Sequence, residues 1–420
     1  MELVWREPSW SSLRPESAST RWQVGWRQLF GNGILARRMR RLRGGFPSAQ
    51  RPFPAQVSMA RIALIPGDGV GSEVMTQAVR VLEVLRDAGV DSLAWEEWDL
   101  GADRFLRTGT TITDGEFQSL ADDYDAILLG ALGDPRVPSN EHARDILLGL
   151  RFRLDLYVNY RPCRLLHPAI SPLKAGGERP MDLRVFRENT EGVYGGMGGS
   201  FKKGTPDEVA VQEDLNTRKG VERIIRAACG YALERGLDRV TMVDKANAMP
   251  HVGSLWRRTF QEVSEEFPLQ ETRTMYVDAM AMDLVRNPDA HQVVVTSNLF
   301  GDILSDLAAV LTGGLGIAPS ANLHPGQHAL FEPVHGSAPD IAGTGTANPM
   351  AAILCVGLLM EYLGHEEVGV QLEEVVTEAL AGEITTPDLG GGKTTEEVGA
   401  WIAGRLAHRI AAPGHSPAAD

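Results

Sequence analysis

Two aspartates, Asp302 and Asp306, have the spacing of a pair of metal ligands. They follow the β-branched run Val293–Thr296, which is predicted to be a buried strand, and Gly301 is predicted to turn the chain into a helix. Side chains four residues apart lie on one face of a helix, so the two carboxylates would repel each other unless a cation lies between them. Oxygen ligands suit a hard divalent cation. The alternative interpretation is an acidic first turn that complements the helix dipole.

Three arginines, Arg151, Arg161 and Arg187, each stand at the end of a predicted element. A planar guanidinium matches a carboxylate through two parallel hydrogen bonds, so the recurrence favours a cluster that binds a small anionic substrate. For any one of these arginines, a surface salt bridge is the alternative.

Three further side chains could handle protons or a metal. Lys245 follows the predicted strand 239–243, and Asp278 follows another strand that ends near Tyr276. The carboxyl ends of strands are where α/β proteins place reactive groups, although a solvated lysine is the alternative for Lys245. Tyr194 lies among glycines that imply an unusual backbone, as in loops that present functional side chains.

Strands and helices alternate from residue 60 to residue 408, which predicts an α/β fold with a largely parallel sheet. The first strand, 61–65, leads through Gly67, Gly69 and Gly71 into a helix. Such a turn can approach a phosphate or a nicotinamide, but a plain strand-to-helix turn is the default interpretation. The segment 331–348, rich in glycine, alanine and serine, is predicted to be a loop against which a ligand can lie.

Composition bounds the class of protein. The chain has 420 residues, of which 43% are hydrophobic and 23% charged, enough for two globular domains. A net charge of −14 argues against nucleic acid or an anionic membrane as partner, and the longest apolar run, 350–360, is too short to span a bilayer. Three widely spaced cysteines without a CxxC motif suit a reducing compartment and no zinc site.

Residues 1–58 are predicted to lie outside the fold. They contain ten arginines, three glutamates and neither aspartate nor lysine. An extension upstream of a natural start at Met59 is favoured over an organellar transit peptide. The first interpretation places the protein in the cytoplasm and the second in an organelle.

Beyond residue 59 the chain resembles the β-decarboxylating dehydrogenases, the family of isopropylmalate, isocitrate, homoisocitrate and tartrate/malate dehydrogenases. The matching stretches, in family order, are IPGDGVGSE (65–73), LLGLRFRLDLYVNYRP (147–162), RENTEGVY (187–194), DKANAM (244–249), NLFGDILSDLAA (298–309), FEPVHGSAPDIAGTGTANP (331–349) and TPDLGGGKTT (386–395). The resemblance implies a fold distinct from the usual dinucleotide-binding one, with a large domain of residues 60–156 and 313–406 and a small domain of residues 157–312. It also implies a homodimer that shares its active sites.

The resemblance implies a role for each candidate residue. Arg151, Arg161 and Arg187 would hold the substrate carboxylates. Asp302 and Asp306 of one subunit, with Asp278 of the other, would bind magnesium or manganese next to the substrate. Lys245 of the second subunit would be the general base for the hydroxyl proton, and Tyr194 would protonate the enol carbon after decarboxylation.

The resemblance further implies NAD as cofactor. The residues that would bind it are His335, Gly336, Ser337, Ala338, Pro339, Asp340, Ile341, Ala342, Gly343 and Asn348. Asp340 and Ile341 match positions beside the adenosine ribose. A carboxylate accepts a hydrogen bond from a free 2′-hydroxyl but repels a 2′-phosphate, which favours NAD over NADP.

The choice of substrate depends on the helix before Arg151. Isocitrate enzymes place serine and asparagine six and four residues before this arginine, where this chain has Asp145 and Leu147. An acid and an apolar side chain would leave a third carboxylate unpaired, which is costly. Leu147 suits an isopropyl group, so we expect oxidative decarboxylation of 3-isopropylmalate to 2-oxoisocaproate.

Two departures keep other substrates open. RENTEG (187–192) stands where many isopropylmalate enzymes have RELTGG, and GALGDP (130–135) replaces the usual Gly-Gly-Pro. Tartrate or D-malate is therefore the first alternative and homoisocitrate the second. A non-catalytic regulatory subunit is a different class of protein, and the complete set of arginines, aspartates, tyrosine and lysine argues against it.

Overall fold

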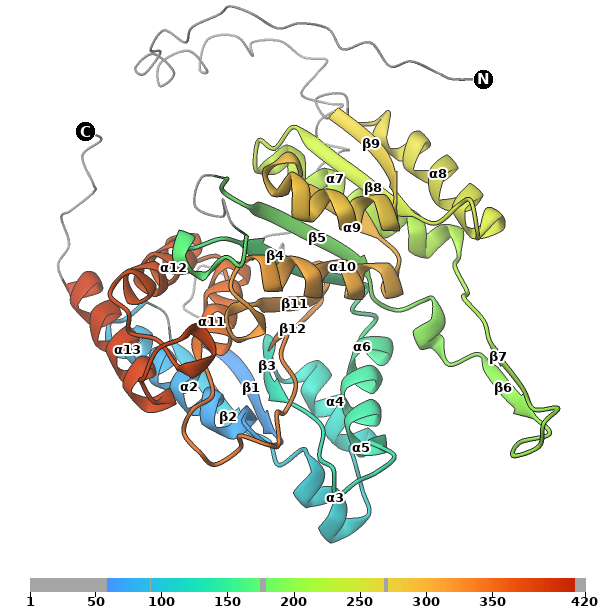
Figure 1. The fold of residues 1–420 in the computed structure, drawn as a ribbon. Helices are drawn as coiled ribbons and strands as arrows, with labels where there is room; N and C mark the ends of the chain where they lie inside the picture. The colour runs from blue at the N-terminus through green and yellow to red at the C-terminus, as the bar shows by residue number, and fades with distance from the viewer. Residues whose placement is uncertain (1–58, 91, 174–178, 268–270, 412–420) are drawn as a thin grey trace, which may run out of the picture. The chain divides into compact units, whose positions relative to one another are not determined.

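The computed structural model describes residues 59–90, 92–173, 179–267 and 271–411. Both interpretations of residues 1–58 fall outside this range. Within it, strands and helices alternate in an α/β arrangement, which confirms the predicted fold class (Figure 1).

Ten strands form one sheet (Figure 1). In order across the sheet they are β2 (Leu93–Glu97), β1 (Ala60–Gly67), β3 (Ala126–Ala131), β12 (His328–Pro333), β11 (Pro319–His324), β4 (Val158–Arg164), β5 (Asp182–Glu188), β10 (Val293–Thr296), β8 (Arg239–Asp244) and β9 (Glu271–Tyr276). Neighbours are parallel except at the centre, where β12, β11, β4 and β5 pair antiparallel. The sheet is therefore largely parallel, as predicted.

The central strands β11 and β12 are not among the strands expected from the sequence, and the first part of the segment 331–348 belongs to β12 rather than to a loop. The reason is that several inward-facing side chains of these strands are polar. Asn322 is fully buried and bonds to Asn159 and Asn189, and Ser320 donates to the carbonyl of Glu332. Buried polar groups that satisfy one another remove the apolar pattern that marks a strand.

Helices cover both faces of the sheet. They are α2 (Gly71–Asp87), α3 (Ala102–Thr108), α4 (Asp114–Asp122), α5 (Glu141–Ala143), α6 (Gly149–Arg153), α7 (Arg218–Glu234), α8 (Pro250–Ser264), α9 (Val277–Arg286), α10 (Asn298–Leu311), α11 (Met350–Tyr362), α12 (Glu366–Ala381) and α13 (Thr395–Ala411). Helices α2, α7, α8 and α11 to α13 share one core cluster, whereas α9 and α10 pack on strand residues of the opposite parity. Among the described helices, none is long and apolar enough to cross a membrane.

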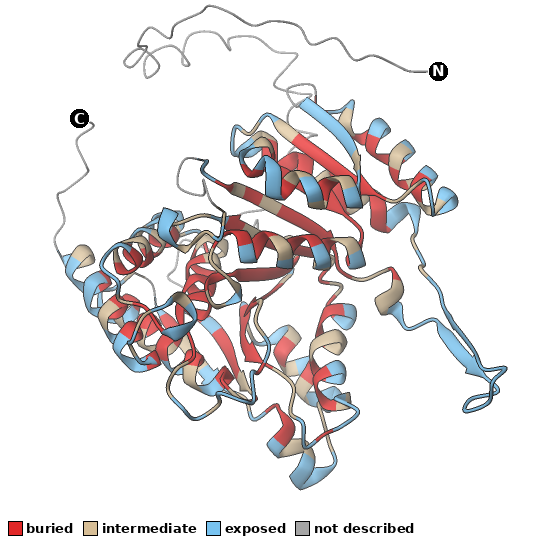
Figure 2. Cartoon of the chain, in the orientation of Figure 1, coloured by how far each residue is buried: buried red, intermediate tan, exposed pale blue. Residues whose placement is uncertain are grey.

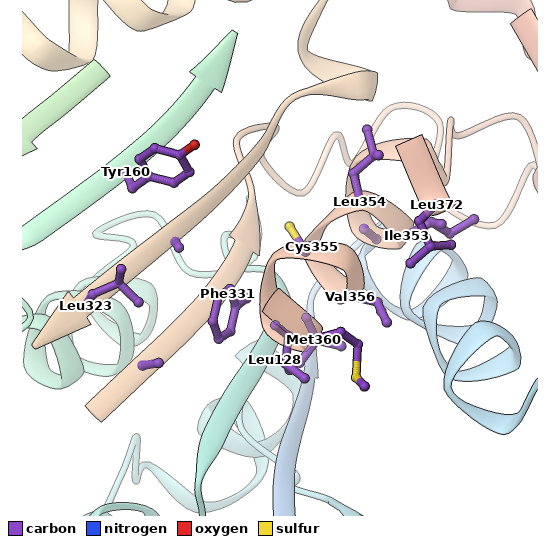
Figure 3. Close-up of a cluster of buried hydrophobic side chains, with 14 of the residues drawn as sticks. Leu128, Tyr160, Leu323, Phe331, Ile353, Leu354, Cys355, Val356, Met360 and Leu372 are labelled. Atoms are coloured by element: carbon purple, nitrogen blue, oxygen red, sulfur yellow. The ribbon is translucent and has the colours of Figure 1, made fainter. Parts of the chain in front are cut away.

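Helix α11 is the centre of the largest core cluster. Its residues are almost all buried because it is apolar around its whole circumference, as expected for a helix enclosed by other elements. Figure 3 shows its side chains Cys355 and Met360 in one cluster with Phe331 of β12 and Leu323 of β11.

A two-stranded ribbon of β6 (Gly198–Phe201) and β7 (Val209–Gln212) projects from the rest of the chain (Figure 1). Every residue of both strands is exposed, in contrast to the buried sheet (Figure 2). The ribbon is not among the elements expected from the sequence.

The sheet runs through both predicted domains without a break. Its first five strands come from residues 60–131 and 319–333, and its other five come from residues 158–296. The division into a large and a small domain stays a prediction.

Candidate active site

Helix α10 carries the aspartate pair, and its start differs from the expectation. It begins at Asn298, so Gly301 lies inside the helix rather than at a turn before it. A Cβ at position 301 would lie 2.6 Å from both Cβ and Cγ of Arg187, so the glycine lets that side chain lie against the helix. The first turn of α10 contains no acidic residue. The alternative of helix-dipole complementation by Asp302 and Asp306 is therefore wrong.

Arg187 and Arg161 converge on this aspartate pair from β5 and β4. Arg187 is almost fully buried, and it donates from Nη1 to Asp302 and from Nε to Asn298, the latter at 2.9 Å. Arg161 donates from Nη1 to Oδ1 of Asp306 at 3.0 Å and from Nη2 to Oδ1 of Asp302 at 3.4 Å. Two guanidinium groups thus neutralise the two carboxylates inside one protomer.

Tyr194 completes this cluster. Its hydroxyl donates to Oδ2 of Asp302 at 2.9 Å, and the guanidinium of Arg187 lies 5.2 Å from the centre of its ring. Gly192 and Gly196 on either side have φ angles of 81° and 74°, which confirms that the backbone around Tyr194 is unusual. Burial and the negative charge of Asp302 raise the pKa of Tyr194, so its hydroxyl holds its proton.

The two aspartates differ in their electrostatics. Burial alone would raise the pKa of Asp302, but the charges of Arg187 and Arg161 outweigh it and lower that pKa. The pKa of Asp306 is raised, because burial and the neighbouring Asp302 outweigh the attraction of Arg161. Burial and the charges of Arg161 and Arg151 lower the pKa of Arg187. A cluster in which like charges disfavour each other is typical of a site that awaits charged ligands.

Arg151 reaches the site from α6, one turn after Leu147. Its Nη2 donates to Oε1 of the buried Glu332 at 2.7 Å, and the same oxygen accepts from Asn322 at 2.8 Å. Leu147 lies in a single π-helical turn, Arg144–Leu148, between α5 and α6, and it packs partly buried on an apolar cluster. Such turns are frequent at functional sites because they re-aim side chains.

Asp68 is a positioning residue that the sequence did not reveal. It lies in the glycine turn after β1, and its carboxylate accepts from the backbone of Ala102 and of Gly133, each at 2.7 Å. The buried His142 of α5 lies 2.9 Å from the same carboxylate. Asp68 therefore ties the turn to the helical segment of Leu147 and Arg151. The sequence feature that could have indicated Asp68 is an acidic residue between two glycines in a strand-to-helix turn.

Lys245 and Asp278 form a second, separate pair. Lys245 Nζ lies 2.6 Å from Oδ1 of Asp278, and this bond lowers the pKa of Asp278. Within the described residues, no hydrogen bond or ion pair connects either side chain to Asp302 or Asp306, and no group of three acidic, histidine or cysteine residues is placed to hold a metal. One protomer thus brings together the arginines, Tyr194 and two aspartates, but not Lys245 and Asp278.

The predicted cofactor loop follows β12. Asp340 and Ile341 are exposed, whereas Ser337 and Asn348 are buried. Asn348 donates to Asp388 at 3.1 Å and accepts from the backbone of Met350, so it also fixes the start of α11. The other predicted residues, His335, Gly336, Ala338, Pro339, Ala342 and Gly343, lie along the same loop between β12 and α11.

Two contacts hold this loop on the start of α2. A Cβ at Gly69 would lie 2.1 Å from the carbonyl oxygen of Ser337, so only glycine allows the two turns to meet. Glu73, which the sequence did not single out, accepts from the backbone of Gly343 and, at 3.1 Å, of Gly345. The sequence feature that could have indicated Glu73 is an acidic residue in the first turn of a helix that follows a glycine turn.

The residues fit the implied metal and dinucleotide. Asp302 and Asp306 offer oxygen ligands one helical turn apart, as a hard divalent cation requires. Within the described residues, the buried Nε2 of His335 has no hydrogen-bond partner, and no atom lies within 4 Å of a Cβ built at Gly336. An orphaned polar atom beside open backbone is suited to a polar ligand.

Comparison with known proteins supplies relatives of nearly full length. A family model described as isocitrate/isopropylmalate dehydrogenase matches residues 61–402. The chain is 44% identical over 351 residues to the 3-isopropylmalate dehydrogenase of Thermobifida fusca, covering 83% of this chain and 98% of that protein. It is 48% identical over 323 residues to the protein of that name from Frankia casuarinae, covering 76% of this chain and 92% of the relative.

Solved structures give the same picture. An isocitrate dehydrogenase from Methylococcus capsulatus matches with a TM-score of 0.75 and 36% identity, over 83% of this chain and 100% of that one. A beta-decarboxylating dehydrogenase from Thermococcus kodakarensis, in its apo form, matches with a TM-score of 0.70 and 38% identity, over 84% of this chain and 98% of that one.

Proposed function

The chain belongs to the isocitrate/isopropylmalate dehydrogenase family, and from this we propose that it oxidises and decarboxylates 3-isopropylmalate with NAD. The observation that carries the choice of substrate is Leu147, an apolar side chain one turn before the buried Arg151. An apolar group at this place offers dispersion contacts to an isopropyl group and no partner for a third carboxylate. The names of the Thermobifida fusca and Frankia casuarinae relatives agree with this choice.

The motif RENTEG, which kept tartrate, D-malate and homoisocitrate open, has a local explanation. Asn189 bonds to Asn322 and to the carbonyl of Leu156. The carboxylate of Glu191 accepts from both the backbone and the hydroxyl of Thr217, just before α7. These side chains make contacts within the protein that stabilise the fold, so the motif does not favour another substrate.

The arginines would bind and orient the substrate. Arg161 and Arg187 face one another across Asp302, and each presents a planar fork to a carboxylate. Their charges, with that of Arg151, would hold the two carboxylates while the hydroxyl carbon is aimed at the cofactor loop. Glu332, bonded to Arg151, fixes the direction of that guanidinium.

Proton transfer falls to two side chains. Lys245, as the neutral amine, would accept the hydroxyl proton as hydride leaves the carbon, and its contact with Asp278 holds the side chain in place. Tyr194, whose raised pKa keeps the hydroxyl protonated, would deliver a proton to the enol carbon after carbon dioxide has left.

Metal and cofactor complete the chemistry. Asp302 and Asp306, with Asp278 of the partner subunit, would hold magnesium or manganese, which would supply Lewis-acid stabilisation of developing negative charge; NAD would supply the hydride acceptor. The loop 335–348 would hold the cofactor, with the exposed Asp340 and Ile341 beside the ribose. A carboxylate there favours NAD over NADP.

A homodimer would unite the two separate clusters. Exposed apolar side chains line α9 and α10, among them Met282 (60% exposed) and Ile303 (54%). The ribbon adds Phe201, which is 64% exposed, and Val209, which pairs with it across the strands. Exposed apolar groups gathered on neighbouring elements mark a docking surface. A second copy on this surface would bring its Lys245 and Asp278 to Asp302 and Asp306.

The cytoplasm is the compartment that we propose. The three cysteines Cys163, Cys229 and Cys355 are buried and free. Free thiols are typical of proteins in reducing compartments.

One assay tests the proposed function. The purified chain is incubated with Mg²⁺ and with NAD or NADP, and formation of the reduced cofactor is followed with 3-isopropylmalate, D-malate, tartrate, homoisocitrate and isocitrate. We expect the highest kcat/KM for 3-isopropylmalate with NAD, and loss of activity when EDTA removes the metal. A higher value for another substrate, or comparable efficiency with NADP, would contradict the proposal.

A further inference from the structure

Arg257 and Asp244 form a bidentate ion pair next to the proposed general base. Asp244 is the last residue of β8 and directly precedes Lys245, whereas Arg257 lies in α8, which packs on β8 (Figure 1). Nε of Arg257 donates to Oδ2 of Asp244 at 2.6 Å, and Nη2 donates to Oδ1 at 3.0 Å. The side chain of Asp244 is 5% exposed, so water competes little for these bonds. Two parallel charge-assisted bonds fix both distance and direction between α8 and the end of β8.

The carboxylate of Asp244 also orders the turn that contains Lys245. Oδ1 of Asp244 accepts from the backbone N–H of Ala246 at 3.2 Å. The carbonyl of Lys245 accepts from the backbone of Ala248 at 2.9 Å. A Cβ at Gly253 would lie 2.4 Å from that of Ala246, so the glycine lets this turn lie against α8. The backbone on both sides of Lys245 is therefore held in place.

The side chain of Lys245 lies beside the end of the neighbouring strand. Tyr276 ends β9 and is paired with Asp244 in the register of the two strands. Nζ of Lys245 lies 5.9 Å from the centre of the Tyr276 ring, and Cζ of Arg257 lies 5.0 Å from the same centre. Both distances are within the range at which an aromatic ring attracts a cation. Arg257 thus contacts both the residue before Lys245 and the ring beside its Nζ.

The place where Lys245 would act explains why its position has to be set in advance. In the proposed dimer, Lys245 reaches a substrate held by the partner subunit, so the substrate-binding arginines of its own chain cannot guide it. A general base has to lie within about 2.6–3.2 Å of the atom whose proton it accepts. A displacement of about 1 Å can lower the rate by about 100-fold.

We propose that Arg257 is a positioning residue for Lys245. Its fork holds Asp244 and thereby the start of the turn, and its contact with Tyr276 keeps the ring beside Nζ. The inference rests on the proposed function, because Arg257 acts on the reaction only through proton transfer by Lys245. The alternative is an ion pair that only stabilises the fold, and the two roles differ in their kinetic consequences.

The experiment is steady-state kinetics of Arg257→Gln with Mg²⁺, NAD and 3-isopropylmalate. We expect kcat to fall by about 10–100-fold, because the fork that orients the turn is lost. KM for the substrate should stay within about twofold, because the arginines that bind it are unchanged. Arg258→Gln removes the same charge from the next, exposed residue of α8 and should keep the wild-type kcat. Urea unfolding shows whether each variant is folded.

A second comparison tests whether Arg257 acts through Lys245. In Lys245→Met the base is absent, so the addition of Arg257→Gln should change the residual kcat by less than about twofold. Arg257→Lys keeps the charge but not the fork, so its kcat should lie between those of the wild type and Arg257→Gln, and it gives the test if the latter does not fold.

The possible results separate this inference from the proposed function. A wild-type kcat in Arg257→Gln, or a further loss of about tenfold in the double variant, would overturn the positioning role alone. A wild-type chain without activity on 3-isopropylmalate would overturn the proposed function, and the inference with it.

Discussion

Substitution of Gly301 by alanine tests whether the contact between α10 and Arg187 builds the active site. The added Cβ would lie 2.6 Å from two carbons of Arg187. Ordinary contacts begin near 3.4 Å, so one of the two groups has to move by about 1 Å. Arg187 is held at its far end by Asn298 and Asp302, and the movement therefore disturbs the guanidinium that we propose binds substrate.

The expected effects on stability and on activity differ in size. Alanine is favoured over glycine inside a helix by about 1 kcal/mol. Overpacking of a buried contact costs about 1–3 kcal/mol, so the net loss of stability is about 0–2 kcal/mol. A positioning group displaced by about 1 Å can lower kcat/KM by about 100-fold. Activity should fall far more than stability.

Gly404→Ala is the matched control. Gly404 lies in α13, and no atom lies within 4 Å of a Cβ built there. This variant should gain about 0.5–1 kcal/mol from helix propensity and keep wild-type kinetics. Urea unfolding and NAD reduction with 3-isopropylmalate are measured for both variants. Wild-type kcat/KM in Gly301→Ala would refute the reasoning.

Four further predictions follow from contacts and charges in the structure. Asp68→Asn places an amide against the donors of Gly133 and His142, so it should cost about 1–3 kcal/mol in urea unfolding; unchanged stability would contradict the positioning role. Lys245→Met should lower the rate of hydride transfer by about 10²–10⁴-fold while calorimetry shows nearly intact Mg²⁺ binding, and retained turnover would remove Lys245 from the mechanism. Burial near the end of α11 raises the pKa of Glu361 to about 7 in the folded chain, so the folded state binds this proton more tightly than the unfolded state, and stability from this group is lost as the pH rises from about 4.5 to about 7. In urea unfolding, the free energy of unfolding of Glu361→Gln minus that of the wild type should therefore increase by about 1–3 kcal/mol as the pH rises from 5 to 8. A difference that stays constant with pH would argue against the raised pKa. Phe201→Asp on the exposed ribbon should give a monomer in sedimentation and lose activity, whereas the adjacent Ser200→Asp should do so less; an active Phe201→Asp monomer would exclude a shared active site.

The sequence predicted those elements whose signals are local. Strand β10 has the predicted bounds, and β8 extends the predicted strand 239–243 by one residue. An apolar run or a regular period is enough to fix such elements. The roles of Arg161, Arg187 and Tyr194 as neighbours of Asp302 were expected from their positions at element ends and from family resemblance, and the structure brings these four side chains together.

Other features depend on contacts between residues far apart in the chain. The sequence predicts a turn at Gly301 because glycine usually marks one, whereas the residue allows a close approach of Arg187 to α10, which no local pattern encodes. The bond between Asp68 and His142 joins residues 74 positions apart. Strand β11 was missed since Asn322 obtains its partners from β4 and from the segment after β5, both distant in sequence.

Asp302 accepts hydrogen bonds from Arg187, Arg161 and Tyr194, so in the proposed site it occupies the arginines that would bind a substrate carboxylate. A substrate carboxylate that takes over these arginines would release Asp302 to a metal cation, and a metal that captures Asp302 would release the arginines to the substrate. With both ligands bound, the metal would pair with Asp302 and the arginines with the substrate carboxylates. Substrate alone would leave Asp302 without a cation, and metal alone would leave the arginines without a carboxylate. If the proposed site binds both, the affinities for metal and substrate would be linked, and each ligand would strengthen the binding of the other.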